Sequence, residues 1–411
     1  MLPPHVIALV AWAALGIALN VGIARFTYGV MLPALQRDLA LDYFGGGALN
    51  AAHLLGYLAG TLAAPALARR LGMPRLARYA HALVALGALL CAVAPGGTSA
   101  GPALLALGRL GTGLGAGAGI VAILVLVFAA VPAASRSLAS ALVWSGMGFA
   151  VVLSGLAAGS LVESVHGWRA AFVVSAVLAA LLVFAFPPRG LRAAGAEPAA
   201  AAEPAADAEP AAAATSHGLR QFLRARWLFL IGAYFMFGAG YIAWSTFAGA
   251  RLAAIGAPLG AVSAMWIAFG AAMIAGSGLS FTVLHIDRQR RFALVAALLA
   301  GALGALVSWN DAAGAALAGA LLVGLGVSST PTIVTTYARE RCSAEDYALA
   351  FSVATAALGI GQLLGPLMAG ALADRFSVAA VALFAVAVYA LGAVFSLLDG
   401  FTAPAARRTG G

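Results

Sequence analysis

Twelve long apolar runs divide this chain of 411 residues. Each run is close to the roughly 20 residues that an α-helix needs to cross the hydrocarbon core of a bilayer, or longer. The 63% of hydrophobic and 9% of charged residues exclude a soluble globular protein, a disordered chain and a nucleic-acid-binding protein. We therefore predict an all-α membrane protein with twelve transmembrane helices. The predicted spans cover residues 6–35, 46–68, 77–95, 102–131, 138–162, 168–187, 227–250, 259–284, 292–309, 313–337, 347–373 and 377–398.

A polar segment separates the first six spans from the last six. Residues 188–219 contain three Glu-Pro pairs within alanine, a composition that builds no core and in which proline interrupts a helix. Residues 218–226 (GLRQFLRAR) are either an amphipathic stretch on the membrane surface or the solvated start of the seventh span. The predicted parts are an N-terminal six-helix bundle (1–188), a cytoplasmic linker (189–225) and a C-terminal six-helix bundle (226–411).

The two groups of spans share a short repeat. With a shift of 211 residues, SGLAAGSLVE at 154–163 aligns with GPLMAGALAD at 365–374, so that Glu163 falls on Asp374. Duplicated halves around a site near the bilayer midplane are typical of secondary transporters. The repeat therefore predicts two pseudo-symmetric bundles.

The arginines predict the orientation. All 23 basic residues are arginine, and two of them lie within spans. If the N-terminus is inside, seventeen others flank the inner ends of the spans and four lie outside, namely Arg37, Arg169, Arg251 and Arg375. Because positive charge collects on the cytoplasmic side, we expect both termini and the linker to be cytoplasmic, in a bacterial inner membrane. The net charge of +9 thus reflects topology and indicates no acidic partner.

Six plus six spans, a central linker and repeated halves resemble the major facilitator superfamily over essentially the whole chain. Within it, three segments are similar to the YbfB/YjiJ-type group. They are LGIALNVGIARFTYGVMLPALQ at 15–36, LNAAHLLGYLAGTL at 49–62 and FGAGYIAWSTFA at 237–248. The resemblance implies the major facilitator fold and transport by alternating access, and it leaves the solute open.

Two loops resemble the gating motif of this superfamily. PALARRLGMPRLAR, between the second and third spans, departs from it where Pro65 replaces a glycine and Arg69 replaces an aspartate. HIDRQRR is the matching loop of the second half. The residues to which the resemblance gives a gating or structural role are Arg70, Gly72, Arg75, Asp287 and Arg288, together with Arg109 of the fourth span.

Arg25 lies inside the first apolar run. A charged side chain at the bilayer centre costs from about 3 to over 10 kcal/mol, so Arg25 should face an aqueous cavity and meet an anion or a dipole. The acidic residues all lie in loops, in the linker or at span ends. In organic-anion symporters of the superfamily, an Asp-Arg pair of the first span binds the substrate carboxylate. Here the resemblance places Ala24-Arg25 at this position, so the arginine is present and the aspartate is absent. Alternatively, backbone carbonyls satisfy Arg25 or its side chain extends to the interface.

The second predicted span carries a polar stripe. Asn50, His53, Tyr57 and Thr61 follow spacings of 3, 4 and 4 residues and therefore share one helical face. Such a stripe on an apolar helix predicts the lining of a cavity. His53 is the candidate carrier of a coupling proton, since histidine titrates near neutral pH. The alternative is a neutral His53 that is hydrogen-bonded to a neighbouring helix.

The other substrate-binding candidates are polar or aromatic residues in predicted spans. They are Asn20, Tyr28, Trp144, Tyr241, Trp244, Trp266 and Gln362, in addition to Arg25, Asn50, His53 and Tyr57.

These features together predict a secondary active transporter, not an enzyme, that moves a small organic anion such as a carboxylate. Protons would be the coupling ion, and the protein would act as a monomer in the lipid bilayer. No motif for a cofactor, a metal or a nucleic acid is present in the sequence. An exporter of hydrophobic or aromatic compounds is the alternative transporter. A membrane sensor or assembly subunit that transports nothing is the alternative class.

Overall fold

The computed structural model describes residues 4–132, 135–164, 166–185, 225–286, 290–342 and 344–402, and their regular structure is helical. The first bundle comprises α1 (Pro4–Ile17), the π-helix η1 (Ala18–Phe26), α2 (Thr27–Leu39), α3 (Tyr43–Leu71), α4 (Met73–Ala92), α5 (Ala100–Ala130), α6 (Arg136–Leu156), α7 (Ala158–Glu163) and α8 (Gly167–Phe184). The second comprises α11 (Ala225–Ala254), α12 (Leu259–Ile286), α13 (Arg290–Val307), α14 (Ala313–Arg339), α15 (Ala344–Arg375) and α16 (Ala380–Thr402).

The membrane-spanning helices confirm the predicted fold class. Eleven helices of the described residues are long and apolar enough to cross a membrane, and Phe292–Val307 is a shorter apolar helix at the predicted ninth span. The segments α1, η1 and α2 form one continuous helix over Pro4–Leu39. The predicted linker at 189–225 lies almost entirely outside the described residues, so the domain boundaries stay a prediction.

The predicted fifth span is divided in the structure. It breaks at Ala157, between α6 and α7, instead of running unbroken over 138–162. Ser154 donates its hydroxyl proton to the carbonyl of Ala150 at 2.8 Å, a bond that competes with the helical ladder and bends helices. Gly155 follows it, and glycine also weakens a helix interior.

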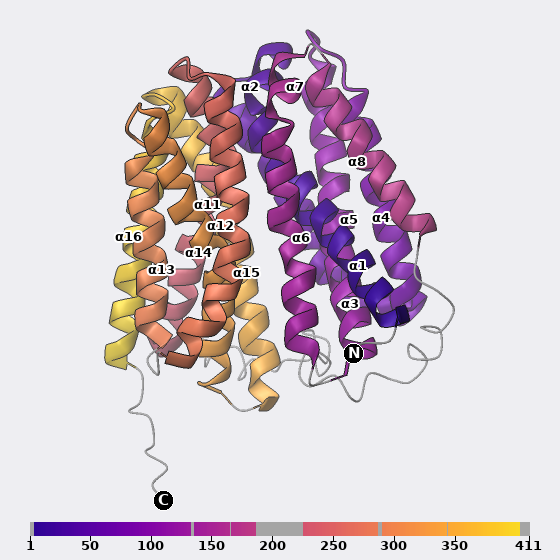
Figure 1. Cartoon of the computed structure of the whole chain (residues 1–411), viewed down its shortest axis with the longest axis vertical. Helices are drawn as coiled ribbons and strands as arrows, with labels where there is room; N and C mark the ends of the chain where they lie inside the picture. Colours follow the sequence, from indigo (N-terminus) through magenta and orange to yellow (C-terminus); the bar gives the residue numbers. More distant parts are fainter. Residues whose placement is uncertain are drawn as a thin grey trace, which may run out of the picture.

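The helices form two bundles that lie side by side (Figure 1). In the first, α5 packs against α3 and α4, and in the second, α11 packs against α15 and α16 while α14 packs against α12 and α13. The bundles meet mainly where α2 packs against α11, α3 against α15, and α6 against α12, with a smaller contact between α7 and α12. Groups from η1, α3, α11 and α15 can therefore converge between the bundles.

Glycines allow α3 and α5 to approach closely. A Cβ atom on Gly113 would lie 1.9 Å from the carbonyl oxygen of His53, and one on Gly117 would lie 2.1 Å from that of Tyr57. Neither distance leaves room for a side chain, so the backbones themselves are in contact. This contact fixes the face of α3 that carries His53 and Tyr57 against α5.

One end of the molecule is held shut by a polar contact between the bundles. The carboxylate of Asp374, at the end of α15, accepts hydrogen bonds from the backbone N–H groups of Tyr43 at 2.8 Å and Phe44 at 2.7 Å. These N–H groups belong to the first turn of α3, which has no partners for them within its own helix. We call this contact the latch and this end of the molecule the latch end. The N-terminus lies at the opposite end (Figure 1).

Candidate functional site

The first span is locally a π-helix, and this segment carries Arg25. Nine residues, Ala18–Phe26, adopt the wider π geometry between two α-helical segments. π-Helical segments are rare and frequently occur at functional sites, because they displace side chains and release backbone carbonyls from the regular ladder. Arg25 is in the last turn of η1 and is only 7% exposed.

Arg25 bonds across the boundary between the bundles. Its Nη2 donates to the hydroxyl oxygen of Tyr241 on α11 at 2.7 Å. The same oxygen accepts a hydrogen bond of 2.7 Å from Nε2 of Gln362 on α15. Three predicted binding residues that are far apart in the sequence thus meet at one oxygen atom, between the two bundles.

Aromatic rings surround the guanidinium group of Arg25. Its central carbon lies 5.8 Å from the ring centroid of Phe26, 5.7 Å from that of Tyr57 and 5.6 Å from that of Tyr241. Ring faces attract a cation within about 6 Å, but they do not neutralise its charge. The Nε atom of Arg25 is buried without a hydrogen-bond partner, and no carboxylate pairs with Arg25 among the described residues. The cation therefore keeps unused donors.

We predicted that Arg25 would face an open cavity, and the structure shows it covered. Tyr241 and the surrounding rings leave it little exposed in this conformation. A hollow of about 370 Å³ near the latch end, between α2, α7, α11 and α12, does not include Arg25. Arg25 is nevertheless directed toward the second bundle, and not toward the outer surface.

Arg109 is fully engaged by the protein. Its Nη1 donates to the carbonyl of Ala24 at 2.5 Å, its Nη2 to Oδ1 of Asn50 at 2.8 Å and its Nε to the carbonyl of Leu49 at 3.4 Å. The guanidinium lies 4.5 Å from the ring centroid of Tyr28, and the residue is 1% exposed. Arg109 thus holds the backbone directly before Arg25, while the gating or structural role that the resemblance implies for it stays a prediction.

Asn50 provides a second hydrogen bond between the bundles. Its Nδ2 donates to the hydroxyl oxygen of Thr246 on α11 at 2.7 Å, while its Oδ1 accepts from Arg109. Thr246 was not among the predicted residues. The adjacent Ser245-Thr246 pair inside an apolar span is the available signal, but it is weak because hydroxyl groups often bond within their own helix, as Thr246 does to the carbonyl of Ile242.

His53 lies inside the first bundle. Its Nδ1 is 3.1 Å from the hydroxyl of Thr112, which also donates to the carbonyl of Arg109 at 2.8 Å. The His53 side chain is fully buried, and its Nε2 has no hydrogen-bond partner within the described residues. Nε2 can therefore take up a new hydrogen-bond partner, and the role of His53 as a proton carrier stays a prediction.

Other predicted residues lie apart from Arg25. Asn20 is buried against Gly119 of α5, and Tyr28 donates its hydroxyl proton to the carbonyl of Gly46 at 2.7 Å. Trp144 is partly buried on α6. Within the described ranges, no hydrogen bond or ring contact ties these three side chains to Arg25.

The two tryptophans of the second bundle differ in their surroundings. The indole N–H of Trp244 donates to the hydroxyl of Ser308 at 3.1 Å, and its ring packs on Phe269 with centroids 5.3 Å apart. Trp266 is fully buried beside Gly29 of α2, where the two bundles touch.

The gating residues are only partly described. Arg70, Gly72 and Arg75 lie at the exposed junction of α3 and α4, where Gly72 has a φ of +78° that favours glycine. Asp287 and Arg288 lie outside the described residues. The structure therefore shows the turn of the first loop and leaves its gating role a prediction.

A buried ion pair in the second bundle was not singled out from the sequence. Both Nη atoms of Arg341 donate to the carboxylate of Asp399, which also accepts from the hydroxyl of Tyr337 at 2.7 Å. Asp399 is fully buried, although it stands at the end of a span. Its partner is already in place, so it is not available to Arg25.

Comparisons with known proteins identify the family. The family described as "Uncharacterised MFS-type transporter YbfB" matches residues 17–398. The multidrug resistance protein Stp of Mycobacterium tuberculosis (strain CDC 1551 / Oshkosh) is 32% identical over 155 residues, which are 38% of this chain and 28% of that protein. The match thus spans less than a third of that relative.

Solved structures show the same fold. A bacterial homologue of the human lysosomal transporter Spinster, in an inward-facing conformation, has a TM-score of 0.71 at 17% identity and covers 99% of this chain and 100% of its own. The nucleoside transporter NupG has a TM-score of 0.75 at 12% identity, over 97% and 99%. The xylose transporter XylE from E. coli has a TM-score of 0.73 at 15% identity, over 99% and 100%. The chain belongs to the YbfB-type family of the major facilitator superfamily and is a multi-pass membrane protein of secondary transport, not an enzyme.

Proposed function

We propose that this protein moves a small organic anion, a carboxylate, across the membrane by alternating access and couples its movement to protons. The observation that carries the proposal is Arg25, a cation buried between the bundles with unused donors and no acidic partner among the described residues. The predicted placement in a bacterial inner membrane, with cytoplasmic termini, belongs to the same proposal.

An anion would satisfy Arg25 better than its present partner does. A buried charge is costly unless it is paired and hydrogen-bonded, and Tyr241 offers only a neutral oxygen. A carboxylate can accept two parallel hydrogen bonds from a guanidinium, and such charge-assisted bonds are roughly twice as strong as neutral ones. Replacement of the Tyr241 oxygen by a carboxylate oxygen therefore favours binding of the solute at this point.

The position of Arg25 suits alternating access. Arg25 belongs to the first bundle, whereas Tyr241 and Gln362 belong to the second, so a solute between them touches both. The Asn50–Thr246 bond also crosses the boundary. A ligand shifts a conformational equilibrium by its different affinity for the two states, and these cross-bundle contacts are the ones that must break when the bundles rock.

His53 is the proposed proton carrier. It lies on the same face of α3 as Tyr57, one helical turn from a ring beside Arg25. The buried carboxylate of Asp399 is already paired with Arg341, which leaves no free acid for this role among the buried groups described here. If His53 is not the carrier, the proton travels on the carboxylic acid itself.

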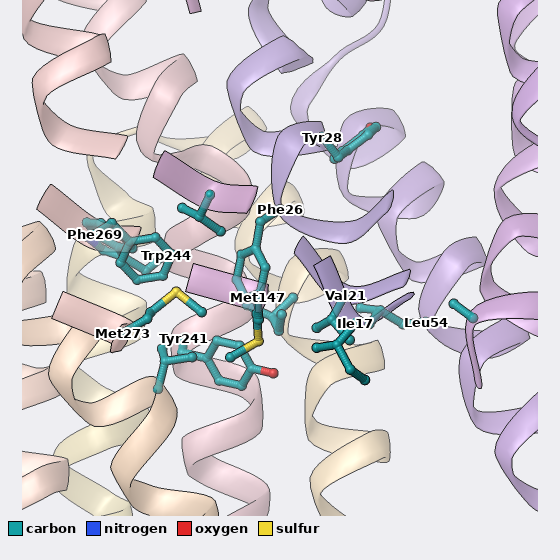
Figure 2. Packing of buried hydrophobic residues seen from close by; sticks show 14 of the residues in the cluster. Ile17, Val21, Phe26, Tyr28, Leu54, Met147, Tyr241, Trp244, Phe269 and Met273 are labelled. Carbon is teal, nitrogen blue, oxygen red and sulfur yellow. The ribbon is translucent and has the colours of Figure 1, made fainter. Parts of the chain in front are cut away.

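The alternative solute is a neutral or hydrophobic aromatic compound that is exported. It is favoured by the rings and thioethers around Tyr241, which include Phe26, Phe269 and Met273 (Figure 2). The similarity to a protein named for multidrug resistance supports the same alternative. A neutral solute would leave Arg25 without a counter-charge, so we prefer the anion.

Uptake of radiolabelled acetate, lactate, succinate and benzoate into proteoliposomes, with and without a pH gradient, tests the proposal. We expect at least one carboxylate to accumulate only with the gradient. Arg25→Ala should abolish accumulation and Arg25→Lys should strongly impair it, because an ammonium cannot reproduce the two-pronged geometry of the guanidinium. Arg37→Lys is the matched control, since Arg37 lies on the same span but donates to the carbonyl of Val162 near the latch end. Equal uptake by the Arg25→Ala variant and the unaltered protein would refute anion binding by Arg25.

A further inference from the structure

The region around Arg25 also constrains the kind of anion. We propose that the solute is a monovalent aromatic carboxylate, with its carboxylate on Arg25 and its ring among the aromatic side chains of Phe26, Trp244 and Phe269. This inference rests on the proposed function and specifies its substrate class. Three observations carry it, namely the count of available charges, the donors that meet at Tyr241 and the chemistry of the surrounding walls.

Among the arginines inside the spans, Arg25 alone has a positive charge available to a solute. Arg25 and Arg109 are the two arginines inside the spans, and Arg109 directs Nε, Nη1 and Nη2 to protein oxygens and is covered by the ring of Tyr28. Arg25 uses only Nη2 within the described part of the chain. A second carboxylate on the solute would be desolvated without a counter-charge, which is strongly unfavourable. A proton on His53 would be held beside Thr112 inside the first bundle and not among the donors at Tyr241, so the charge count still selects a monoanion.

The donors at Tyr241 mark the position of the carboxylate. Arg25 and Gln362 both donate to the hydroxyl oxygen of Tyr241, and these two bonds use both of its lone pairs. The hydroxyl proton of Tyr241 has no acceptor among the described residues, so the phenol can itself donate. When the hydroxyl of Tyr241 moves aside, the N–H groups of Arg25 and Gln362, one from each bundle, are free to bind a carboxylate. No acid side chain pairs with this set within the described part of the chain, so these donors favour a carboxylate over the ammonium group of an amino acid.

The walls beside these donors are aromatic and thioether surfaces. The ring of Phe26 lies 6.4 Å from that of Tyr241 and 5.7 Å from that of Phe269, and Phe269 lies 5.3 Å from Trp244. Met147 and Met273 lie between these rings in Figure 2, and the hydroxyl of Tyr241 points toward the first bundle.

Such walls favour an aromatic solute. Rings prefer edge and offset contacts with other rings, and thioethers adapt to ring edges. The side chains are almost fully buried, and so they do not serve as lipid contacts. Sugars and other polyols, which need many hydrogen bonds, find few partners on this surface.

Binding of five probes to the purified full-length protein tests this inference. We propose isothermal titration calorimetry with benzoate, benzamide, cyclohexanecarboxylate, terephthalate and acetate. Benzoate should bind most tightly. Benzamide lacks the charge and terephthalate adds one, and each should bind at least about tenfold more weakly. Cyclohexanecarboxylate keeps the charge and the size but loses the ring, and should bind about two- to tenfold more weakly.

A matched pair of variants tests whether Phe269 causes the preference for an aromatic over an aliphatic ring. Phe269→Leu should reduce the ratio of benzoate to cyclohexanecarboxylate affinity toward one and leave the need for Arg25 unchanged. Phe172→Leu is the control, because Phe172 is also buried and pairs with Trp168 inside the first bundle, away from Arg25. An unchanged ratio in the Phe269→Leu variant would place the ring elsewhere and overturn the inference.

The outcomes separate this inference from the proposed function. If all monocarboxylates bind equally and Arg25→Ala abolishes their binding, the protein binds anions but the aromatic class is wrong. If terephthalate binds as tightly as benzoate, the charge count is wrong. If benzamide binds and no carboxylate does, both the inference and the proposed function fail, and the aromatic exporter replaces them. If none of the five probes binds, the aromatic class is also wrong.

Discussion

The latch makes a prediction about the equilibrium between the closed and open states of the latch end. Asp374→Ala removes the carboxylate that accepts the N–H groups of Tyr43 and Phe44 from the other bundle. After the change, these N–H groups face water or remain unpaired. The substitution therefore weakens the closed state of this end and should leave the packing within each bundle intact.

The magnitude follows from the two hydrogen bonds. Bonds to a charged group contribute about 1.5–3 kcal/mol each, but exposed ionic contacts are strongly screened. We take about 1 kcal/mol for each of the two bonds of the exposed Asp374, including its interaction with the helix N-terminus. A total of about 2 kcal/mol increases the ratio of open to closed molecules about 30-fold, since each 1.4 kcal/mol is tenfold.

Distances between spin labels measure this ratio. Labels on Ser99→Cys and Ser377→Cys would report the separation of the bundles at the latch end, since both residues are exposed there and belong to different bundles. Cys91 and Cys342 form no disulfide and would first be replaced by alanine, so that the labels react only at the introduced cysteines. Double electron–electron resonance should show a longer-distance population that grows in the Asp374→Ala variant.

Asp42→Ala is the matched control. Asp42 lies at the same end and accepts from the N–H of Gly45 at 2.6 Å, but this bond caps α3 and does not cross between the bundles. We expect Asp42→Ala to lower helix stability and to leave the label distances unchanged. Identical distance distributions for Asp374→Ala and the unaltered protein would refute the reasoning, as would an equal shift in the Asp42→Ala control.

Three further predictions concern coupling and stability. His53→Gln should retain counterflow exchange of the labelled solute but lose accumulation driven by a pH gradient, because exchange needs no net proton movement; accumulation by this variant would exclude His53 as the carrier. Gly113→Ala should lower the unfolding temperature in detergent, since overpacking costs typically about 1–3 kcal/mol. Gly111→Ala is the control and should leave this temperature unchanged, because its Cβ would lie 3.5 Å from its nearest neighbour. Asp399→Ala should destabilise the fold by about 1.5–3 kcal/mol because it removes the buried carboxylate that accepts hydrogen bonds from Arg341 and Tyr337; an unchanged unfolding temperature would show that these bonds contribute nothing.

The sequence alone determined the membrane fold. A run of about 20 apolar residues crosses a bilayer as an α-helix, because only then does every backbone N–H and C=O group find a partner within the segment. The repeat at 154–163 and 365–374 indicated the two bundles. The break at Ala157 was not visible, because it depends on how Ser154 uses its hydroxyl group.

The sequence also singled out the residues whose burial would be costly. Arg25 inside an apolar run predicts a site, because a charge within the membrane is costly unless the fold supplies a partner for it. The stripe with Asn50 and His53 followed from helical periodicity alone. For Arg109, the sequence indicated a structural role but not its partners.

Only the tertiary structure decided which of these residues meet. Tyr241 and Gln362 are 121 residues apart, and their bond depends on the packing of α11 against α15. The bonds of Arg109 to Ala24, Leu49 and Asn50 depend on the packing of α5 against η1 and α3, and they leave Arg25 as the arginine with donors to spare. The residue type and the apolar run around it show which side chain needs a partner. The distances between packed helices decide which partner it finds. The sequence therefore predicted that Arg25 needs a partner, and the fold determined that its partner in this conformation is a tyrosine of the opposite bundle.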